Sequence, residues 1–170
     1  LPARHSAMKH AAGEYILFLD SDDRLDLDAC SVLHDELSKN PVDVLEFGYI
    51  RENSKEKNTI VKNYENRLEK ILSNEYPGTI WNKAYSCSVI KKSLEAIESF
   101  SATFAEDYYF SIIFSFFAKS FGYVDNYLHH YMLSTGISTQ KDYSLEKFER
   151  ILNDFRSIEF HLRDFIKIYS

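Results

Sequence analysis

The sequence contains few of the residues that make turns and cross-links. Only five Gly and three Pro occur in 170 residues, too few for a β-sandwich or barrel built from many tight turns. The two cysteines, Cys30 and Cys87, lie far apart without Cys-x-x-Cys or Cys/His spacing, so neither a zinc site nor a disulfide framework has support. This cysteine usage fits a reducing cytosol. Helices with a modest sheet are therefore the expected fold.

Long basic runs and long apolar runs are missing too. The chain has 20 basic and 26 acidic residues, a net charge of −6, and it has no Lys/Arg stripe that could follow a phosphate backbone, so nucleic-acid binding is not expected. The longest apolar stretches are about six residues, whereas a membrane-spanning helix needs ~20. The first residues show no signal-peptide pattern. We expect a soluble protein, peripheral to a membrane at most.

Apolar residues, by contrast, are abundant. They make up 45% of the chain and include thirteen Phe and twelve Tyr, which excludes a disordered chain and suits one domain with a sizeable core. Their periodicity predicts both helices and strands. Helices are expected at residues 3–12, 27–39, 68–72, 106–120 and 145–169, and strands at residues 15–19, 42–49, 59–62, 82–90 and 123–133.

Single residues predict details of these elements. Gly13 is expected to end the first helix in the left-handed conformation, and Gly122 to end the helix at 106–120. Asp26 is the expected N-cap of the helix at 27–39. The strand at 15–19 is wholly apolar, which is typical of a central strand covered on both faces.

The last helix is long and amphipathic. Its apolar residues recur at alternating three- and four-residue spacing, a heptad seam that predicts packing on the rest of the domain or on a second subunit. The seam consists of Phe148, Ile151, Phe155, Ile158, Leu162, Phe165 and Tyr169. We therefore divide the chain into a main portion, residues 1–140, and a C-terminal helix, residues 141–170.

The sharpest feature is the change from apolar to acidic residues at Asp20-Ser21-Asp22-Asp23. In open α/β sheets the ligand crevice lies outside the carboxyl ends of the strands. Clustered carboxylates attract a hard cation such as Mg²⁺ or Mn²⁺, which also binds substrate phosphates. A solvated acidic turn is the alternative. An EF-hand is excluded, because Leu25 and Ser31 stand where its glycine and glutamate would be.

The segment that leads to these acids contains Ala3-Arg4, then Ala11, then Gly13-Glu14-Tyr15-Ile16-Leu17-Phe18-Leu19-Asp20-Ser21-Asp22-Asp23. It resembles the central part of family 2 glycosyltransferases with a GT-A fold. The resemblance implies a partial GT-A-like α/β fold, a mixed sheet flanked by helices. It also implies that Asp20 and Asp22 bind Mn²⁺ or Mg²⁺ and the donor diphosphate, with Asp22 the direct metal ligand. Arg4 is implied to lie on the donor side, and His5 departs from the family's usual Asn.

A second segment, Ala105-Glu106-Asp107-Tyr108-Tyr109-Phe110, resembles the family's Glu-Asp-x-x-Phe motif. By this resemblance Asp107 is the catalytic base and Glu106 its acceptor-side partner. Physically, a carboxylate within ~3 Å of a hydroxyl can accept its proton. The alternative for the motif alone is a pair of acids that stabilise a helix start.

Two further segments show weaker resemblance to the family. Trp81-Asn82-Lys83-Ala84-Tyr85 is similar to its Trp-Asn-Lys-x-Tyr segment, which implies that Trp81 stacks on a sugar and Lys83 pairs with a phosphate or orients a carboxylate. A core position is the alternative for Trp81. Met132 stands where the family commonly has Arg, so a cationic diphosphate contact is missing. His129 or His130 could substitute, although a structural role is favoured for both.

The resemblance implies an inverting glycosyltransferase that moves a sugar, from a uridine diphosphate sugar by preference, to a hydroxyl of a glycan or lipid-linked acceptor in bacterial polysaccharide assembly. The cytoplasm, or the periphery of the inner membrane, is the implied location. The family's first strand and helix have no counterpart before Leu1. We therefore expect residues 1–140 to be the C-terminal portion of a GT-A domain, inactive alone and self-associating through an exposed sheet edge.

Two other classes of function stay open. A haloacid-dehalogenase-like phosphotransferase also carries Asp-x-Asp after an apolar strand and would use Asp20 as its nucleophile. A non-catalytic interaction module would use the aromatic surface and the C-terminal helix. Such a module would tolerate the loss of Asp107, which an enzyme of the first kind would not.

Overall fold

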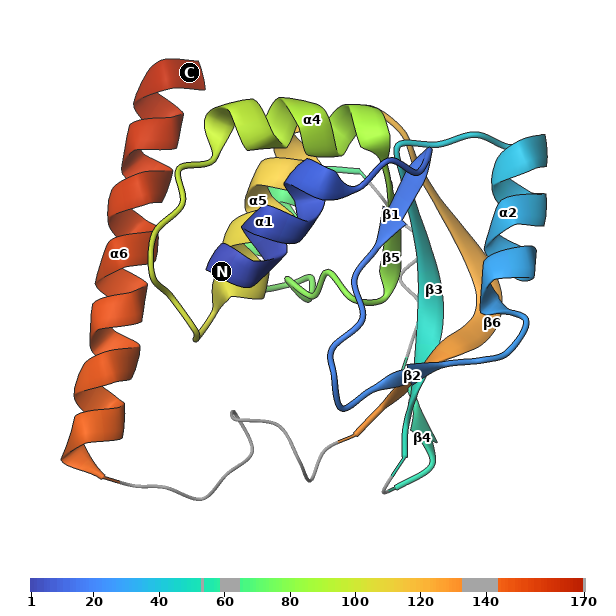
Figure 1. The fold of residues 1–170 in the computed structure, drawn as a ribbon, viewed down its shortest axis with the longest axis horizontal. Coiled ribbons are helices and arrows are strands. Elements are labelled where there is room, and N and C mark those ends of the chain that lie inside the picture. Colours follow the sequence, from blue (N-terminus) through green and yellow to red (C-terminus); the bar gives the residue numbers. More distant parts are fainter. Residues whose placement is uncertain (53, 59–64, 133–143, 170) are drawn as a thin grey trace.

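The computed structural model describes residues 1–52, 54–58, 65–132 and 144–169, and within them a mixed sheet lies between helices (Figure 1). The elements in chain order are α1 (Pro2–His10), β1 (Tyr15–Leu17), β2 (Arg24–Leu25), α2 (Ala29–Lys39), β3 (Val44–Arg51), β4 (Glu56–Lys57), α3 (Arg67–Leu72), β5 (Lys83–Ser86), α4 (Cys87–Ala96), α5 (Glu106–Phe117), β6 (Phe121–Tyr131) and α6 (Leu145–Tyr169). The α/β fold and the long C-terminal helix are thus confirmed.

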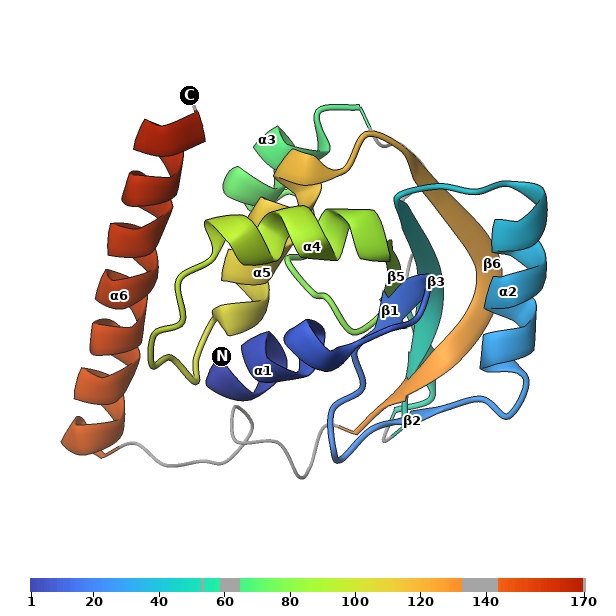
Figure 2. The same cartoon turned by 45° about the horizontal axis from the view of Figure 1, so that its top comes forward.

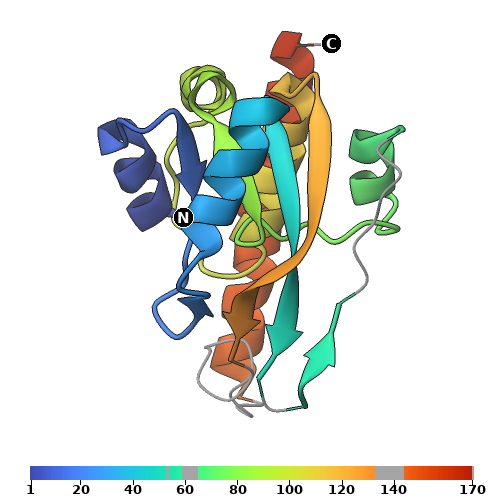
Figure 3. The same ribbon diagram turned by 90° about the vertical axis from the view of Figure 1, so that its right-hand side faces the viewer.

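The sheet is built around β3. Its strand order is β1-β5-β3-β6-β2, and β4 pairs with β3 as a hairpin. The central pair β3 and β6 is parallel, while β1–β5, β5–β3 and β2–β6 are antiparallel. Figure 3 views the molecule from the α2 side, with β3 and β6 side by side behind that helix.

Alternation along β3 separates two apolar cores. Leu45 and Phe47 point to the core that α2 covers, whereas Val44 belongs to the larger core formed with α4 and α5, because successive side chains of a strand face opposite sides. Helix α6 lies beyond α5, at the end of the molecule away from α2 (Figures 1 and 2). The result is a sheet with helices on both faces.

The first strand differs from its prediction. β1 spans only Tyr15–Leu17 and stands at the end of the strand order, so the expectation of a central strand at 15–19 is wrong. Its neighbours do cover both faces, since Ile16 and Phe18 pack into the α5 core while Tyr15 and Leu17 pack against the α2 core. An uninterrupted apolar run therefore indicates a strand that is covered on both faces. It does not indicate a central strand, because an edge strand between two helical layers is covered in the same way.

Three predicted caps are wrong as well. No described glycine has a positive φ; α1 ends at Ala11 in an extended conformation with φ −69° and ψ 128°. Gly122 lies inside β6, where a Cβ would sit 3.3 Å from side-chain atoms of Leu45 and Val42. Helix α2 begins after Asp28, and the backbone N–H of Asp26 instead donates to the carbonyl of Leu128 at 2.9 Å.

The segment at 82–90 is only partly a strand. β5 ends at Ser86, whose hydroxyl accepts a hydrogen bond from the N–H of Val89 at 3.4 Å and caps α4. The predicted strand is wrong beyond that residue, because the serine cap and the apolar spacing of Val89, Ile90 and Leu94 specify a helix. The strand predicted at 59–62 lies outside the described residues.

Helix α6 has the predicted bounds and packs on its own domain. Ile158 and Phe165 are buried in the α5 core, while the seam residues Phe148 and Phe155 stay 59% and 47% exposed. The boundary at residue 140 stays a prediction, since residues 133–143 are not described. Across the described part of the chain, no helix combines the length and apolar character needed to cross a bilayer.

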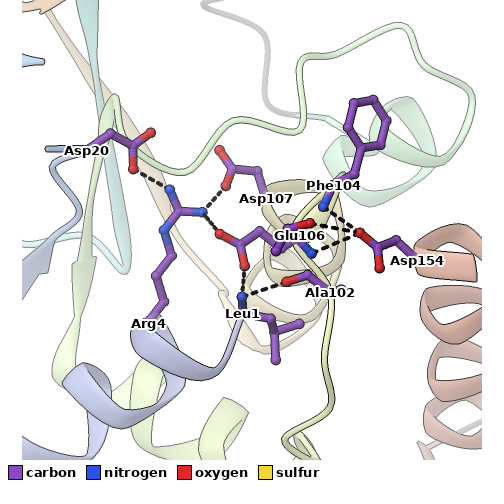
Figure 4. Close-up of polar contacts among 9 residues, drawn as sticks. Leu1, Arg4, Asp20, Ala102, Phe104, Glu106, Asp107 and Asp154 are labelled. Atoms are coloured by element: carbon purple, nitrogen blue, oxygen red, sulfur yellow. Dashed lines mark hydrogen bonds and ion pairs between the residues drawn. The ribbon is translucent and has the colours of Figure 1, made fainter. Parts of the chain in front are cut away.

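Asp154 fastens α6 to the loop before α5. Its Oδ2 accepts hydrogen bonds from the backbone N–H groups of Thr103 and Phe104 at 3.0 and 2.9 Å, and the Asp154 residue is 8% exposed (Figure 4).

Asp154→Ala is expected to lower the free energy of unfolding by about 1–3 kcal/mol, because both donors lose their acceptor. Urea unfolding measures this. Glu159→Ala, which removes an exposed carboxylate from the same helix, should cost less than ~0.5 kcal/mol; equal losses would contradict the role of Asp154.

Candidate functional site

Three separate segments of the chain meet at the guanidinium of Arg4 (Figure 4). Arg4 extends from α1, Asp20 follows β1, and Glu106 with Asp107 forms the first turn of α5. Arg4 Nη1 donates to Glu106 Oε1 at 2.7 Å and also to Asp107, while Nη2 donates to Asp20. The acidic groups of the two predicted motifs therefore converge on one cation.

Local packing explains why the carboxylates point to this place. Phe18, two residues before Asp20, is buried against Tyr85 and Phe114, which fixes where the chain leaves β1. Helix α5 starts after Ala105, a residue with φ of 59°, so the chain turns sharply just before Glu106. Acidic side chains in the first turn also interact favourably with the positive end of the helix dipole.

The cluster has more negative than positive side chains. Three carboxylates share the Arg4 guanidinium, and the side chain of Arg4 is only 18% exposed. Glu106 also contacts the nitrogen of Leu1, which donates to the carbonyl of Ala102 at 2.8 Å. In buried sites that contain several like charges, the pKa values of the titratable groups depart from their ordinary values.

Asp107 shows this departure. Burial is the largest cause and raises its pKa, Arg4 acts in the opposite direction, and the charges of Asp20 and Glu106 raise it again. The net result is a raised pKa. A carboxylate of higher pKa is a stronger base, provided that it is still ionised at the working pH. Asp107 is thus chemically suited to accept a proton.

The remaining two acids after β1 differ in their surroundings. Asp22 lines an open pocket of about 330 Å³, together with Arg24, Glu52 and Met132. Asp23 is turned inward, where its carboxylate accepts a hydrogen bond from the backbone N–H of Met132 at 2.8 Å. Asp23 therefore holds the end of β6 against the acidic loop, whereas Asp22 faces a space that a ligand can enter.

Both histidines of β6 pair with carboxylates. His129 Nε2 lies 2.9 Å from Asp23, and burial, opposed by that carboxylate, lowers the pKa of the histidine. The two ring nitrogens of His130 each lie 2.6 Å from a carboxylate oxygen, of Asp26 and of Glu52. These contacts are structural, as the sequence favoured, because they join β6 to the acidic loop and to the end of β3.

The donor set suits a divalent cation only in part. Among the described residues, no three His, Cys, Asp or Glu side chains lie close enough together to enclose a metal ion. Asp20 is engaged by Arg4, and Asp22 faces the pocket. Mg²⁺ is commonly held by one or two carboxylates and completed by substrate phosphates. The residues fit such a shared site, in which Asp22 and Asp20 would supply the protein ligands.

Trp81 and Lys83 are buried. The Trp81 ring stacks on His129 and Tyr131, with centroids 4.6 and 5.1 Å apart. Lys83 Nζ donates to the carbonyl of Thr79 at 2.6 Å and to Asn82 Oδ1 at 2.9 Å, and burial lowers the pKa of Lys83 to about 8. The contact of Trp81 with a sugar and that of Lys83 with a phosphate or a carboxylate stay predictions.

Sequence reasoning did not single out a buried polar network next to Lys83. Arg67 donates to Glu46 Oε2 at 3.1 Å and also to Tyr76, and Asn82 lies at the other Glu46 oxygen. Glu46 is 2% exposed on the central strand. The signal was a carboxylate between the apolar residues Leu45 and Phe47 of the central strand, because a buried charge needs a partner.

Comparison with known proteins gives consistent results. The family model described as Glycosyl transferase family 2 matches residues 2–97, more than half of the chain. The chain is 28% identical over 156 residues to "Putative glycosyltransferase EpsH" of Bacillus subtilis (strain 168), covering 86% of this chain and 45% of that protein.

The fold is also found in solved structures. The crystal structure of S. aureus TarS 1–349 in complex with UDP-GlcNAc has a TM-score of 0.69 at 20% identity, covering 93% of this chain and 45% of that one. The complex of TarS 1–349 with UDP gives 0.62 at 21% identity, covering 77% and 39%. The chain therefore has the fold of part of TarS and spans less than half the length of these relatives.

Arg4→Gln is expected to destabilise the protein by ~2–4 kcal/mol near neutral pH, because three part-buried carboxylates lose their shared cation. Arg4 lowers the pKa of Asp107, so its removal raises that pKa further, and the ionisation of Asp107 then costs more stability as the pH rises. Near pH 4 the loss should be smaller. Urea unfolding at both pH values measures the difference.

Arg163→Gln is the matched control, since Arg163 pairs with Glu159 in solvent and its loss should cost less than ~0.5 kcal/mol at either pH. A loss in Arg4→Gln that does not change with pH would contradict the electrostatic origin.

Proposed function

The chain belongs to glycosyl transferase family 2, and from this we propose that it carries the metal-binding and proton-accepting part of an inverting glycosyltransferase. The reaction moves a sugar from a nucleotide-diphosphate donor to a hydroxyl of a glycan or lipid-linked acceptor. The observation that supports this most strongly is the convergence of Asp20, Glu106 and Asp107 on Arg4. Residues separated by 102 and 103 positions from Arg4 meet there.

Asp107 is the base in this proposal. Its raised pKa suits proton abstraction from the acceptor hydroxyl as the hydroxyl attacks the anomeric carbon. Arg4 opposes the effect of burial and lowers the pKa of Asp107, and Glu106, which contacts the same guanidinium, is the proposed acceptor-side partner. Attack from the face opposite the leaving diphosphate inverts the anomeric centre.

Asp22 and Asp20 are the proposed ligands of Mn²⁺ or Mg²⁺. A bound cation would neutralise negative charge that develops on the departing diphosphate. The excess of carboxylates around Arg4 supports this assignment, because a second cation reduces the repulsion among them. The protein's own contribution is to hold Asp22 at the open pocket while Asp23 anchors the loop from behind.

A uridine diphosphate sugar is the proposed donor, and bacterial polysaccharide assembly the proposed pathway. TarS is crystallised with UDP-GlcNAc and with UDP, and this chain has the same fold. The cytoplasm or the inner face of the membrane is the proposed location. We expect the chain to self-associate, since β1 stands at the sheet edge and pairs with β5 alone among the described strands.

Asp107→Asn tests the base. In the complete protein it should lower kcat at least ~100-fold, because the amide cannot accept the hydroxyl proton, and it should leave UDP affinity unchanged. Steady-state kinetics with the donor and calorimetric UDP titration give the two values. Asp35→Asn, an isosteric change at an exposed carboxylate, should leave both unchanged. Full activity of Asp107→Asn, or a phosphoaspartate at Asp20, would overturn the proposal.

Asp22→Ala tests the metal site. With UDP present, the affinity for Mn²⁺ should fall at least ~10-fold, because a carboxylate ligand is lost. Calorimetric titration of Mn²⁺ into wild type and variant provides the measurement. Equal affinity in the two proteins would remove Asp22 from the site.

A further inference from the structure

The pocket that Asp22 lines is also lined by a basic side chain, that of Arg24. Arg24 follows the acidic loop on β2 and lines the pocket of about 330 Å³ together with Asp22, Glu52 and Met132. The side chain of Arg24 is 65% exposed, so its guanidinium is accessible from solvent. A carboxylate for a metal ion and a guanidinium for an anion thus face one opening.

Glu52 fixes the position of this guanidinium. The Glu52 carboxylate accepts hydrogen bonds from Arg24 and Lys55 and lies 2.6 Å from His130 Nδ1. The Glu52 side chain is only 10% exposed. Hydrogen bonds from Lys55, then from Arg24, lower the pKa of Glu52 to about 2, so the carboxylate stays ionised and keeps its partners over the physiological range.

Glu52 leaves part of the Arg24 guanidinium available for an anion. The single Glu52 carboxylate is shared by two basic side chains, Arg24 and Lys55. Arginine has five N–H donors in a planar fork, and Glu52 cannot occupy all of them. Phosphate oxygens are the acceptors that match this fork with two parallel hydrogen bonds.

The uncharged residue among those that line the pocket is Met132. Met132 lines it with a thioether side chain, and its backbone N–H is held by Asp23 at 2.8 Å. The sequence resemblance left position 132 without the arginine usual in the family. The cation at this pocket comes instead from β2, which pairs with β6 in the register Arg24–His130, two residues before Met132.

We propose that Arg24, positioned by Glu52, binds a phosphate group of the substrate at the pocket that Asp22 lines. The assignment rests on the proposed function, and the phosphate is either the donor diphosphate or a phosphate on the acceptor. In both cases Arg24 acts by direct contact with an anionic oxygen, and Glu52 is a positioning residue.

The test is a set of binding measurements with the complete protein. Arg24→Gln should weaken binding of UDP and of inorganic pyrophosphate ~10–100-fold, because a charge-assisted hydrogen bond is lost, and should weaken UMP binding much less. Affinity for Mn²⁺ alone should not fall. Arg24→Lys should recover part of the affinity, since it keeps the charge without the planar fork. Calorimetry reports all four values independently of turnover.

Arg51→Gln is the matched control. Arg51 is also a partly exposed arginine near the same end of the sheet, but its side chain pairs with Glu56 on β4 and is not among the residues that line the pocket. UDP and pyrophosphate affinity should be unchanged in this variant. Glu52→Gln should reproduce part of the Arg24→Gln effect, because the guanidinium loses its fixed position.

The outcomes separate this inference from the proposed function. If UDP binding needs Asp22 but is the same in Arg24→Gln and wild type, while KM for a phosphate-bearing acceptor rises in the variant, the phosphate belongs to the acceptor. If neither UDP affinity nor that KM changes, the inference is overturned and the proposed function stands. If Asp22→Ala binds Mn²⁺ and UDP as wild type does, the proposed function itself fails.

Discussion

The ion pairs of Arg4 are the interaction on which this site depends. One guanidinium joins the helix before the sheet, the loop after β1 and the start of α5. Without a cation, three part-buried carboxylates would repel one another, and their negative charges would be costly to bury. With it, they become a compact acidic surface in which Asp107 has a raised pKa. The ion pairs of Arg4 therefore both hold the three segments together and affect the pKa of Asp107.

The sheet brings the other half of the site to this surface. Because β3 and β6 are parallel and β2 returns antiparallel to β6, the end of β6 lies beside the acidic loop. Asp23 and Asp26 then pair with His129 and His130, and this holds the loop closed against the strand. Asp22 remains at the open pocket, so the fold assigns different tasks to neighbouring acids.

Arg4 and Arg24 have different electrostatic surroundings. Arg4 is largely enclosed and neutralises carboxylates of the protein itself, whereas Arg24 is exposed and shares Glu52 with Lys55. A guanidinium surrounded by three acids stabilises the site, while one with donors to spare can bind an external anion. Arg4 contacts Asp20 at the start of the short acidic loop and Arg24 directly follows the loop, which suits a ligand that combines a metal ion with phosphate.

The sequence by itself determined the periodic elements and the acidic motifs. The apolar spacing of α6 and the run before Asp20 specified a helix and a strand, because burial imposes a period on the side chains. Partners distant in the chain decided the rest: that β1 is an edge strand, that Trp81 and Lys83 are buried, and that Arg24 stands beside Met132. Contacts between residues a hundred positions apart arise from the packing of whole layers, and no local pattern encodes them.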